Sequence, residues 1–184
     1  MDIYKHIRNF YNSLNQLLNY EVDMTKETKV LGKNEYEDYI KAYEIELKAM
    51  ENIMEKLGYQ YSTNLKLREY EYNNLYKNGE MVFINNNDGF FEYIIVDRVM
   101  YISGVHLLKE FRSIKNIKRT YNLLSLKVEE TKSKDIIVIC QKINLYIKKI
   151  YIKLGFTYYK DFDSLNEIWI IKSNLLKLNL KKRF

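Results

Sequence analysis

The sequence predicts an α+β (mixed α/β) protein, in which a helical N-terminal part precedes a mixed sheet. In residues 1–78 the apolar side chains recur at spacings of three and four, which is typical of helices. From residue 79 short apolar runs alternate with turn residues, which indicates strands. We therefore expect a helical part over 1–78, a sheet-containing core over 79–175 and a basic tail over 176–184, together in one compact domain.

Composition excludes several classes of protein. The 184 residues are 47% hydrophobic and 29% charged, which is typical of a folded chain with a core. No apolar run approaches the roughly 18 residues of a membrane span, and MDIYKHIRNF carries charges where a signal peptide would be apolar. The expected location is therefore the cytoplasm, without membrane attachment.

Cysteine and histidine are too scarce for a disulfide or a metal cluster. The single cysteine, Cys140, excludes an intramolecular disulfide, and His6 and His106 are the two histidines. We predict no metal site. Because Cys140 ends the apolar run DIIVIC, we interpret it as a buried strand thiol rather than a nucleophile.

The formal charge of +6 favours an anionic ligand, but the lysines are spread along the chain, so nucleic acid is not the expected partner. The densest basic cluster is KLNLKKRF at 177–184. We interpret it as a solvated terminus, with salt-sensitive nucleic-acid binding as the alternative.

Three helices are predicted in the N-terminal part, over about 2–19, 34–57 and 62–77, with room for a short strand within 21–31. The longest, 34–57, ends at Gly58 as a C-terminal cap. Its apolar seam is Tyr36, Ile40, Tyr43, Leu47, Met50, Met54 and Leu57. We expect this seam to pack on the same chain, with a coiled coil or homodimer as the alternative.

The remaining elements follow in the order β-β-β-α-β-α-β-β. EMVFI and FFEYIIV flank the turn NNNDG and predict a hairpin, and VMYISGVHLL predicts a third strand. A helix from about Lys115 carries Ile117, Tyr121, Leu124 and Val128 on one face, and DIIVIC follows as a strand buried on both sides. The amphipathic run NLYIKKIYIKLGF, at 144–156, is the second helix, and FTYYKDF and NEIWIIK are the last two strands.

The second helix carries a motif that points to a family. Asn144, Ile147, Tyr151 and Leu154-Gly155-Phe156 have the spacing found after the fifth strand of the GNAT superfamily of N-acyltransferases. Together with the element order, the chain resembles that family over about residues 80–173. The resemblance implies a GNAT-like central mixed sheet flanked by helices.

The resemblance also implies a binding site for acetyl-CoA. In the family an Arg/Gln-x-x-Gly-x-Gly/Ala turn holds the pyrophosphate, because backbone N–H groups at a helix N-terminus attract the anion. Arg112 matches the leading arginine, whereas Lys115 and Ile117 replace the glycines. The implied cofactor-binding residues are Val105, Arg112, Ser113, Lys115, Asn116, Ile117, Lys118 and Asn144.

The implied reaction is direct attack of an amine on the thioester. Tyr151 would be the general acid that protonates the leaving thiolate. Glu92, Asp97 and His106 are the alternative general-base candidates, and a bound water could replace them. Aromatic residues in the segments that form the family's acceptor pocket are Tyr59, Tyr61, Phe162 and Trp169.

We therefore predict an N-acyltransferase that moves an acetyl group from acetyl-CoA to an amine of a protein or small molecule. The missing glycines motivate an alternative, a catalytically inactive GNAT-like scaffold that acts as a protein-interaction or regulatory module. Such a module would use the N-terminal helices to bind a partner or a second copy. The identity of the amine cannot be read from the sequence.

Overall fold

The structure is a computed structural model, and it describes Lys5, Arg8, Asn9, Gly58 and residues 36–56, 79–85 and 87–183. The predicted helix over 62–77, the strand within 21–31, and most of the helix over 2–19 lie outside the described residues. So do Tyr59 and Tyr61 of the predicted acceptor pocket.

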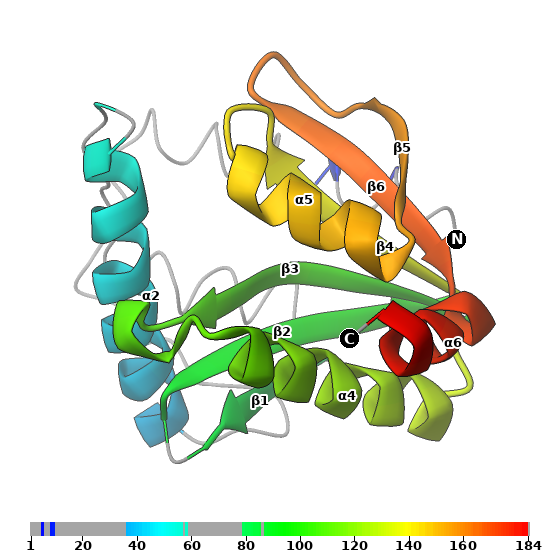
Figure 1. Ribbon diagram of the computed structural model, residues 1–184, viewed down its shortest axis with the longest axis horizontal. Helices are drawn as coiled ribbons and strands as arrows, with labels where there is room; N and C mark the ends of the chain where they lie inside the picture. Colours follow the sequence, from blue (N-terminus) through cyan, green and yellow to red (C-terminus); the bar gives the residue numbers. More distant parts are fainter. Residues whose placement is uncertain are drawn as a thin grey trace. The chain divides into compact units, whose positions relative to one another are not determined.

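A six-stranded mixed sheet in the order β1-β2-β3-β4-β6-β5 forms the centre of the fold (Figure 1). β3 and β4 are parallel, whereas the pairs β1/β2, β4/β6 and β5/β6 are antiparallel. The strands are β1 (Glu80–Ile84), β2 (Gly89–Val96), β3 (Val99–Leu107), β4 (Asp135–Gln141), β5 (Thr157–Asp161) and β6 (Asn166–Lys172).

The described helices are α2 (Tyr36–Lys56), the 3₁₀ turn η1 (Lys109–Phe111), α4 (Ile114–Glu130), α5 (Leu145–Leu154) and α6 (Ser173–Arg183). From residue 79 to 172 the order of strands and α-helices is the predicted β-β-β-α-β-α-β-β. The predicted fold class, a mixed sheet flanked by helices, is confirmed. None of the described helices combines the length and hydrophobicity that crossing a lipid bilayer requires.

Packing divides the chain into two units, Met1–Asp97 with Val105–Phe111, and Arg98–Gly104 with Arg112–Phe184. In the first unit, β1 and β2 form the predicted hairpin, with register from Glu80↔Tyr93 to Ile84↔Gly89. Gly89 begins β2, and a Cβ there would lie 2.2 Å from the His106 carbonyl oxygen. This close backbone approach requires glycine.

Helix α2 packs against β2 with a different face from the predicted one. Ala42, Ile45 and Ala49 are its buried positions, whereas Ile40 of the predicted seam is 36% exposed. The small alanines allow the helix backbone to approach the sheet closely. Larger residues of the seam, such as Tyr43 and Leu47, consequently lie at the edge of the contact and are half-buried.

In the second unit, β4 is buried because it has a strand on each side and helices against it. It pairs with β6 from Asp135↔Lys172 to Gln141↔Asn166. Ile136, Ile137 and Val138 are each at most 2% exposed, as expected for an apolar run in a central strand. The predicted helix face, Ile117, Tyr121, Leu124 and Val128, is buried along α4.

The basic segment is helical, because residues 173–183 form α6, and its lysines and Arg183 are exposed. Leu176 and Leu180, one turn apart, are buried, and α6 packs against both α4 and α5. Lys177 binds Glu129 of α4, and the Asn179 amide donates to the Leu154 carbonyl at 2.9 Å. Two leucines at helical spacing provide the apolar stripe for this packing.

Candidate functional site

The two parallel strands separate along their length. Their ladder runs from Val99↔Asp135 to Ile102↔Val138, whereas β3 continues to Leu107 and β4 to Gln141. β4 therefore extends three residues past its last partner on β3, and Val105 lies three residues past Ile102. The backbone groups of β4 past Val138 have no ladder partner on β3, so a ligand can use them.

Helix α5 begins directly after this part of β4, and both of its ends are capped. The Asn144 side-chain oxygen accepts from the Ile147 N–H at 3.2 Å. Gly155 has a φ of +94°, and the Phe156 N–H donates to the Tyr151 carbonyl at 2.9 Å, the pattern of a Schellman motif. Asn144 and Gly155 thus cap the two ends of α5, which gives both residues a structural role.

Tyr151 lies on the buried face of α5 with 5% of its surface exposed. Its ring centroid is 5.1 Å from that of Phe156 and 6.3 Å from that of Trp169. Burial, and secondarily the neighbouring Tyr121 and Cys140, raise the pKa of Tyr151 well above its ordinary value. Tyr151 is therefore protonated throughout the neutral range, as a general acid must be.

Tyr121 of α4, Cys140 of β4 and Tyr151 of α5 come together within the second unit. Burial is the main cause that raises the pKa of Tyr121, and Cys140 adds to it. The Tyr121 hydroxyl interacts electrostatically with Tyr151 but has no hydrogen bond of good geometry. Since Cys140 is two residues past Val138, this cluster lies at the point where β4 has left β3.

Cys140 is a buried neutral thiol, as its place in DIIVIC suggested. Burial first, and then the charge of Glu167, raise the pKa of Cys140 to about 12. A thiol with that pKa carries almost no thiolate at neutral pH, so it is not an effective nucleophile.

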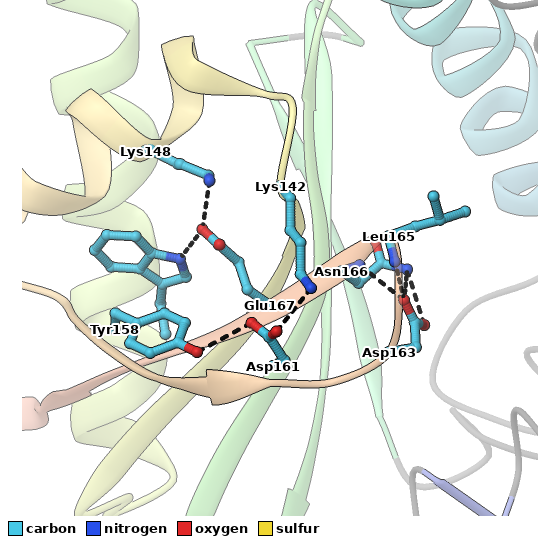
Figure 2. A network of polar contacts seen from close by, with 9 residues as sticks. Lys142, Lys148, Tyr158, Asp161, Asp163, Leu165, Asn166 and Glu167 are labelled. Atoms are coloured by element: carbon cyan, nitrogen blue, oxygen red, sulfur yellow. Dashed lines mark hydrogen bonds and ion pairs between the residues drawn. The ribbon is translucent and has the colours of Figure 1, made fainter.

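A buried carboxylate ties α5 to the sheet (Figure 2). Figure 2 shows Lys148 of α5 and Glu167 of β6 pointing toward one another, with Nζ and Oε1 2.8 Å apart. The same Oε1 accepts from the Trp169 indole N–H at 2.8 Å and lies 3.9 Å from the Cys140 sulfur. Glu167 is only 7% exposed, so its charge depends on these partners.

A second, exposed network holds the β5–β6 hairpin (Figure 2). Asp161 accepts from Lys142 at 2.8 Å and from the Tyr158 hydroxyl at 3.0 Å. These two hydrogen bonds hold the pKa of Asp161 below its usual value. Asp163 accepts from the backbone N–H groups of Leu165 and Asn166 and closes the turn.

The segment that would bind pyrophosphate is the start of α4. Ser113 is the N-cap, and its hydroxyl accepts from the Asn116 N–H at 3.2 Å. The first turn of α4 contains no acidic residue, although acids are favoured there, and Lys115 is exposed. Basic residues oppose the helix dipole at this end, so their presence favours an anion as the partner of these N–H groups.

Ile117, at the position of the family's second glycine, does not project toward a ligand. Its side chain is 6% exposed and belongs to the core, and its N–H donates to the Ser113 carbonyl at 2.9 Å. Ile117 therefore neither obstructs the loop nor supplies a donor. Arg112 and Lys118 are half-buried on either side of Ser113 and Lys115.

The three base candidates occupy different places along β2 and β3. Glu92 is 2% exposed in the middle of β2, and the His106 ring stacks on Phe90 with centroids 4.9 Å apart. Asp97 lies in the exposed turn that leads into Val99, the paired end of β3.

Two buried polar groups near the end of β4 were not identified as candidates from the sequence. Gln141 Oε1 is buried without a hydrogen-bond partner among the described residues, and the Tyr121 hydroxyl has the Tyr151 hydroxyl as its neighbour. Buried polar atoms without a partner are rare in native proteins. Gln141 ends β4, so this oxygen lies where β4 extends past its last partner on β3. A polar residue that closes a continuous apolar run is the signal that could have identified Gln141.

The described residues contain no group of three or more His, Cys, Asp or Glu side chains arranged to hold a metal ion.

Comparison of the sequence with protein-family models and with curated proteins finds no match. Solved structures do match the fold. The PaiA N-acetyltransferase from Thermoplasma acidophilum in complex with coenzyme A is 15% identical, with a TM-score of 0.60 over 79% of this chain and 98% of that one.

Two further solved structures give the same result. A GNAT-family acetyltransferase from Staphylococcus aureus is 16% identical, with a TM-score of 0.60 over 76% of this chain and 96% of that one. An acetyltransferase from Thermus thermophilus is 10% identical, with a TM-score of 0.62 over 77% of this chain and 95% of that one. The chain therefore has the GNAT N-acyltransferase fold, as the 144–156 motif indicated.

Proposed function

We propose that this protein is an N-acyltransferase that transfers an acetyl group from acetyl-CoA to an amine. The observation that carries the proposal is the cluster of Tyr121, Cys140 and Tyr151 at the point where β4 has left β3. A buried, protonated phenol beside an open strand edge has the chemistry that acyl transfer from a thioester needs.

The start of α4 would bind the pyrophosphate of the cofactor. The backbone N–H groups of its first turn provide donors, and Ser113, Lys115 and Lys118 surround them. In the family, glycines allow backbone N–H groups to approach the phosphates closely. Here the ammonium groups of the lysines would replace part of that contact, because they form strong hydrogen bonds to phosphate oxygens. Arg112 adds a planar group suited to two phosphate oxygens.

The pantetheine arm would lie along the end of β4. Gln141 would hydrogen-bond an amide of this arm, since its side-chain oxygen lacks a partner among the described residues. The Asn144 amide N–H₂ would add a donor, because the oxygen of the same side chain is used to cap α5.

Acetyl-CoA supplies the thioester that the amine attacks. Tyr151 would give its hydroxyl proton to the departing sulfur. The raised pKa keeps this proton in place until transfer, but it also makes the phenol a weak acid, so the sulfur must lie within hydrogen-bond distance. The burial of the ring between Phe156 and Trp169 fixes the direction of the hydroxyl.

The amine enters with a proton that a base must remove. Glu92, Asp97 and His106 stay as the alternative candidates for this base, and a bound water could replace them. Glu92 is a carboxylate in β2, and the His106 imidazole stacks on Phe90, so both side chains carry a group of the kind that serves as a general base.

The test is turnover of acetyl-CoA against a panel of primary amines, with Tyr151→Phe compared to Tyr146→Phe. Tyr146 lies on the same helix and is 57% exposed, so its substitution controls for changes in α5. Tyr151→Phe should lower kcat by about 10²–10³-fold with little change in KM, within the usual range for general acids. Equal rates for both variants would remove Tyr151 from the mechanism.

A further inference from the structure

A basic groove lies in the second unit, away from the candidate acyl-transfer site. It has a volume of about 640 Å³. It is lined by Arg98, Ser125, Val128, Glu129, Lys132, Ser133, Lys134, Ser173, Asn174, Lys177, Leu178 and Lys181. Five of these residues are basic and one is acidic, a formal net charge of +4.

The groove is at the opposite end of α4 and β4 from the candidate site. Its residues come from the turn before β3, the last turns of α4, the connection to Asp135, and one face of α6 (Figure 1). The first turn of α4 begins at Ile114, and its 17 residues place the two ends about 25 Å apart. An anion in the groove would therefore not occupy the pyrophosphate position.

Backbone hydrogen bonds join the segments that carry the cations. The Lys134 N–H donates to the Arg98 carbonyl at 2.7 Å, and the Ser173 N–H donates to the Lys134 carbonyl at 3.0 Å. The Arg98 side-chain Nε donates to the Lys132 carbonyl at 3.3 Å. The basic residues are consequently held at fixed positions around the groove.

Two of these residues have a left-handed backbone. Arg98 has a φ of +64° and Lys132 a φ of +52°, where glycine or asparagine is the usual residue. Each such position destabilises the fold by about 1 kcal/mol relative to glycine. The two-residue turn Asp97-Arg98 between β2 and β3 and the C-terminal end of α4 account for this backbone, so both cations are carried on well-defined turns beside the groove.

The charge of the groove is largely uncompensated. Lys177 is paired with Glu129, whereas Lys132, Lys134 and Lys181 have no carboxylate within 4 Å among the residues the structure describes. Three lysines facing one concavity repel one another unless an anion is present. Ser125, Ser133, Ser173 and Asn174 add hydroxyl and amide groups that can hydrogen-bond an oxyanion.

The lining also indicates which anion fits. It contains no aromatic residue, so it offers no surface on which a nucleobase could stack, as single-stranded nucleic-acid sites do. The cations converge from three segments on one groove of limited volume and do not form a long stripe. We propose that this groove is a binding site for a small, multiply phosphorylated anion, separate from the acyl-transfer site.

The test is isothermal titration calorimetry with inorganic tripolyphosphate as the probe, at 50 mM salt. Wild type should bind with a dissociation constant in the micromolar range. Lys134→Gln/Lys181→Gln removes two groove cations and should weaken binding at least tenfold. The charge-matched Lys149→Gln/Lys182→Gln removes two exposed lysines outside the lining and should stay within twofold.

Three results would overturn the proposal. The first is no saturable binding of tripolyphosphate at millimolar concentration to wild type with a normal thermal transition. The second is an equal loss in both double variants, or a loss in Lys115→Gln, which would place the anion elsewhere. The third is binding of a 20-base-pair DNA duplex that tripolyphosphate does not displace, since the partner would then be nucleic acid.

Discussion

Gly155 is the residue at which the structure makes its sharpest stability prediction. Its φ of +94° is strained for alanine, and a Cβ there would lie 2.1 Å from the Asn179 side-chain nitrogen. Alanine at this position would therefore carry about 1 kcal/mol of backbone strain. It would also displace Asn179 from the Leu154 carbonyl, a hydrogen bond of about 1 kcal/mol. Gly155→Ala should lower the free energy of unfolding by about 2–3 kcal/mol.

Two further variants separate these effects. Gly58 has a φ of +74°, and no atom of the described residues lies within 4 Å of a Cβ there, so Gly58→Ala should show the strain of about 1 kcal/mol without a clash. Asn179→Ala should cost about 1 kcal/mol, and it removes the atom that the Cβ meets. The double variant Gly155→Ala/Asn179→Ala should then be less destabilised than the sum of the two single variants, by about 1 kcal/mol.

The assay is equilibrium unfolding in urea. Fluorescence of Trp169, the single tryptophan, follows the second unit, and circular dichroism follows the helices of both units. If Gly155→Ala cost no more than Gly58→Ala, or if Asn179→Ala did not reduce its effect, the packing of α6 on the end of α5 would be refuted.

Three other predictions follow from charged and titrating groups. At pH 8 the thiol reagent DTNB should modify Cys140 about a thousandfold more slowly in the native protein than in urea, because its pKa rises from 9.0 to about 12; equal rates would show an exposed thiol. Glu167→Gln should destabilise by about 2–4 kcal/mol in urea unfolding because it leaves Lys148 without its buried partner; a neutral effect would mean that solvent reaches this pair. The carboxyl of Asp161 should titrate below 3.8 by NMR, so its stabilising contact with Lys142 is present above that pH and lost as pH falls through the lower folded pKa. An ordinary pKa in wild type would contradict this contact, whereas Lys142→Gln should raise the pKa of Asp161 part of the way to its ordinary value because the Tyr158 hydroxyl still donates to it.

Much of the sheet could be predicted because its signals are local. The hairpin of β1 and β2 follows from two apolar runs around NNNDG, and β4 follows from an apolar run long enough for a central strand. The boundaries of α5 follow from Asn144 and Gly155, whose capping geometry depends on neighbouring residues alone. Local chemistry therefore gave the order of elements from residue 79 to 172.

The features that the sequence did not reveal depend on contacts between distant segments. Helix α6 forms because Leu176 and Leu180 find an apolar surface on α4 and α5, which the lysine-rich composition conceals. The buried face of α2 is set by two alanines against β2. The network around Glu167 joins residues 140, 148, 167 and 169, and no pattern in the sequence predicts it.

The candidate site was predictable in part for the same reason. Tyr151 falls at a fixed place in a helix that the sequence identifies. Tyr121 and Gln141 become candidates only because the fold brings them near the part of β4 that extends past β3. The substitution of Ile117 for a glycine suggested an obstructed loop. The structure shows that α4 has already begun at Ile114, so this side chain turns into the core.

The acyl-transferase proposal rests above all on whether acetyl-CoA binds. Isothermal titration calorimetry with acetyl-CoA should give one site with a micromolar dissociation constant, about −8 kcal/mol. Lys115→Gln/Lys118→Gln should weaken it five- to tenfold, whereas Lys134→Gln/Lys181→Gln should not change it. No saturable heat at millimolar acetyl-CoA, from protein that unfolds cooperatively, would contradict the proposal and leave a GNAT-type fold without its cofactor.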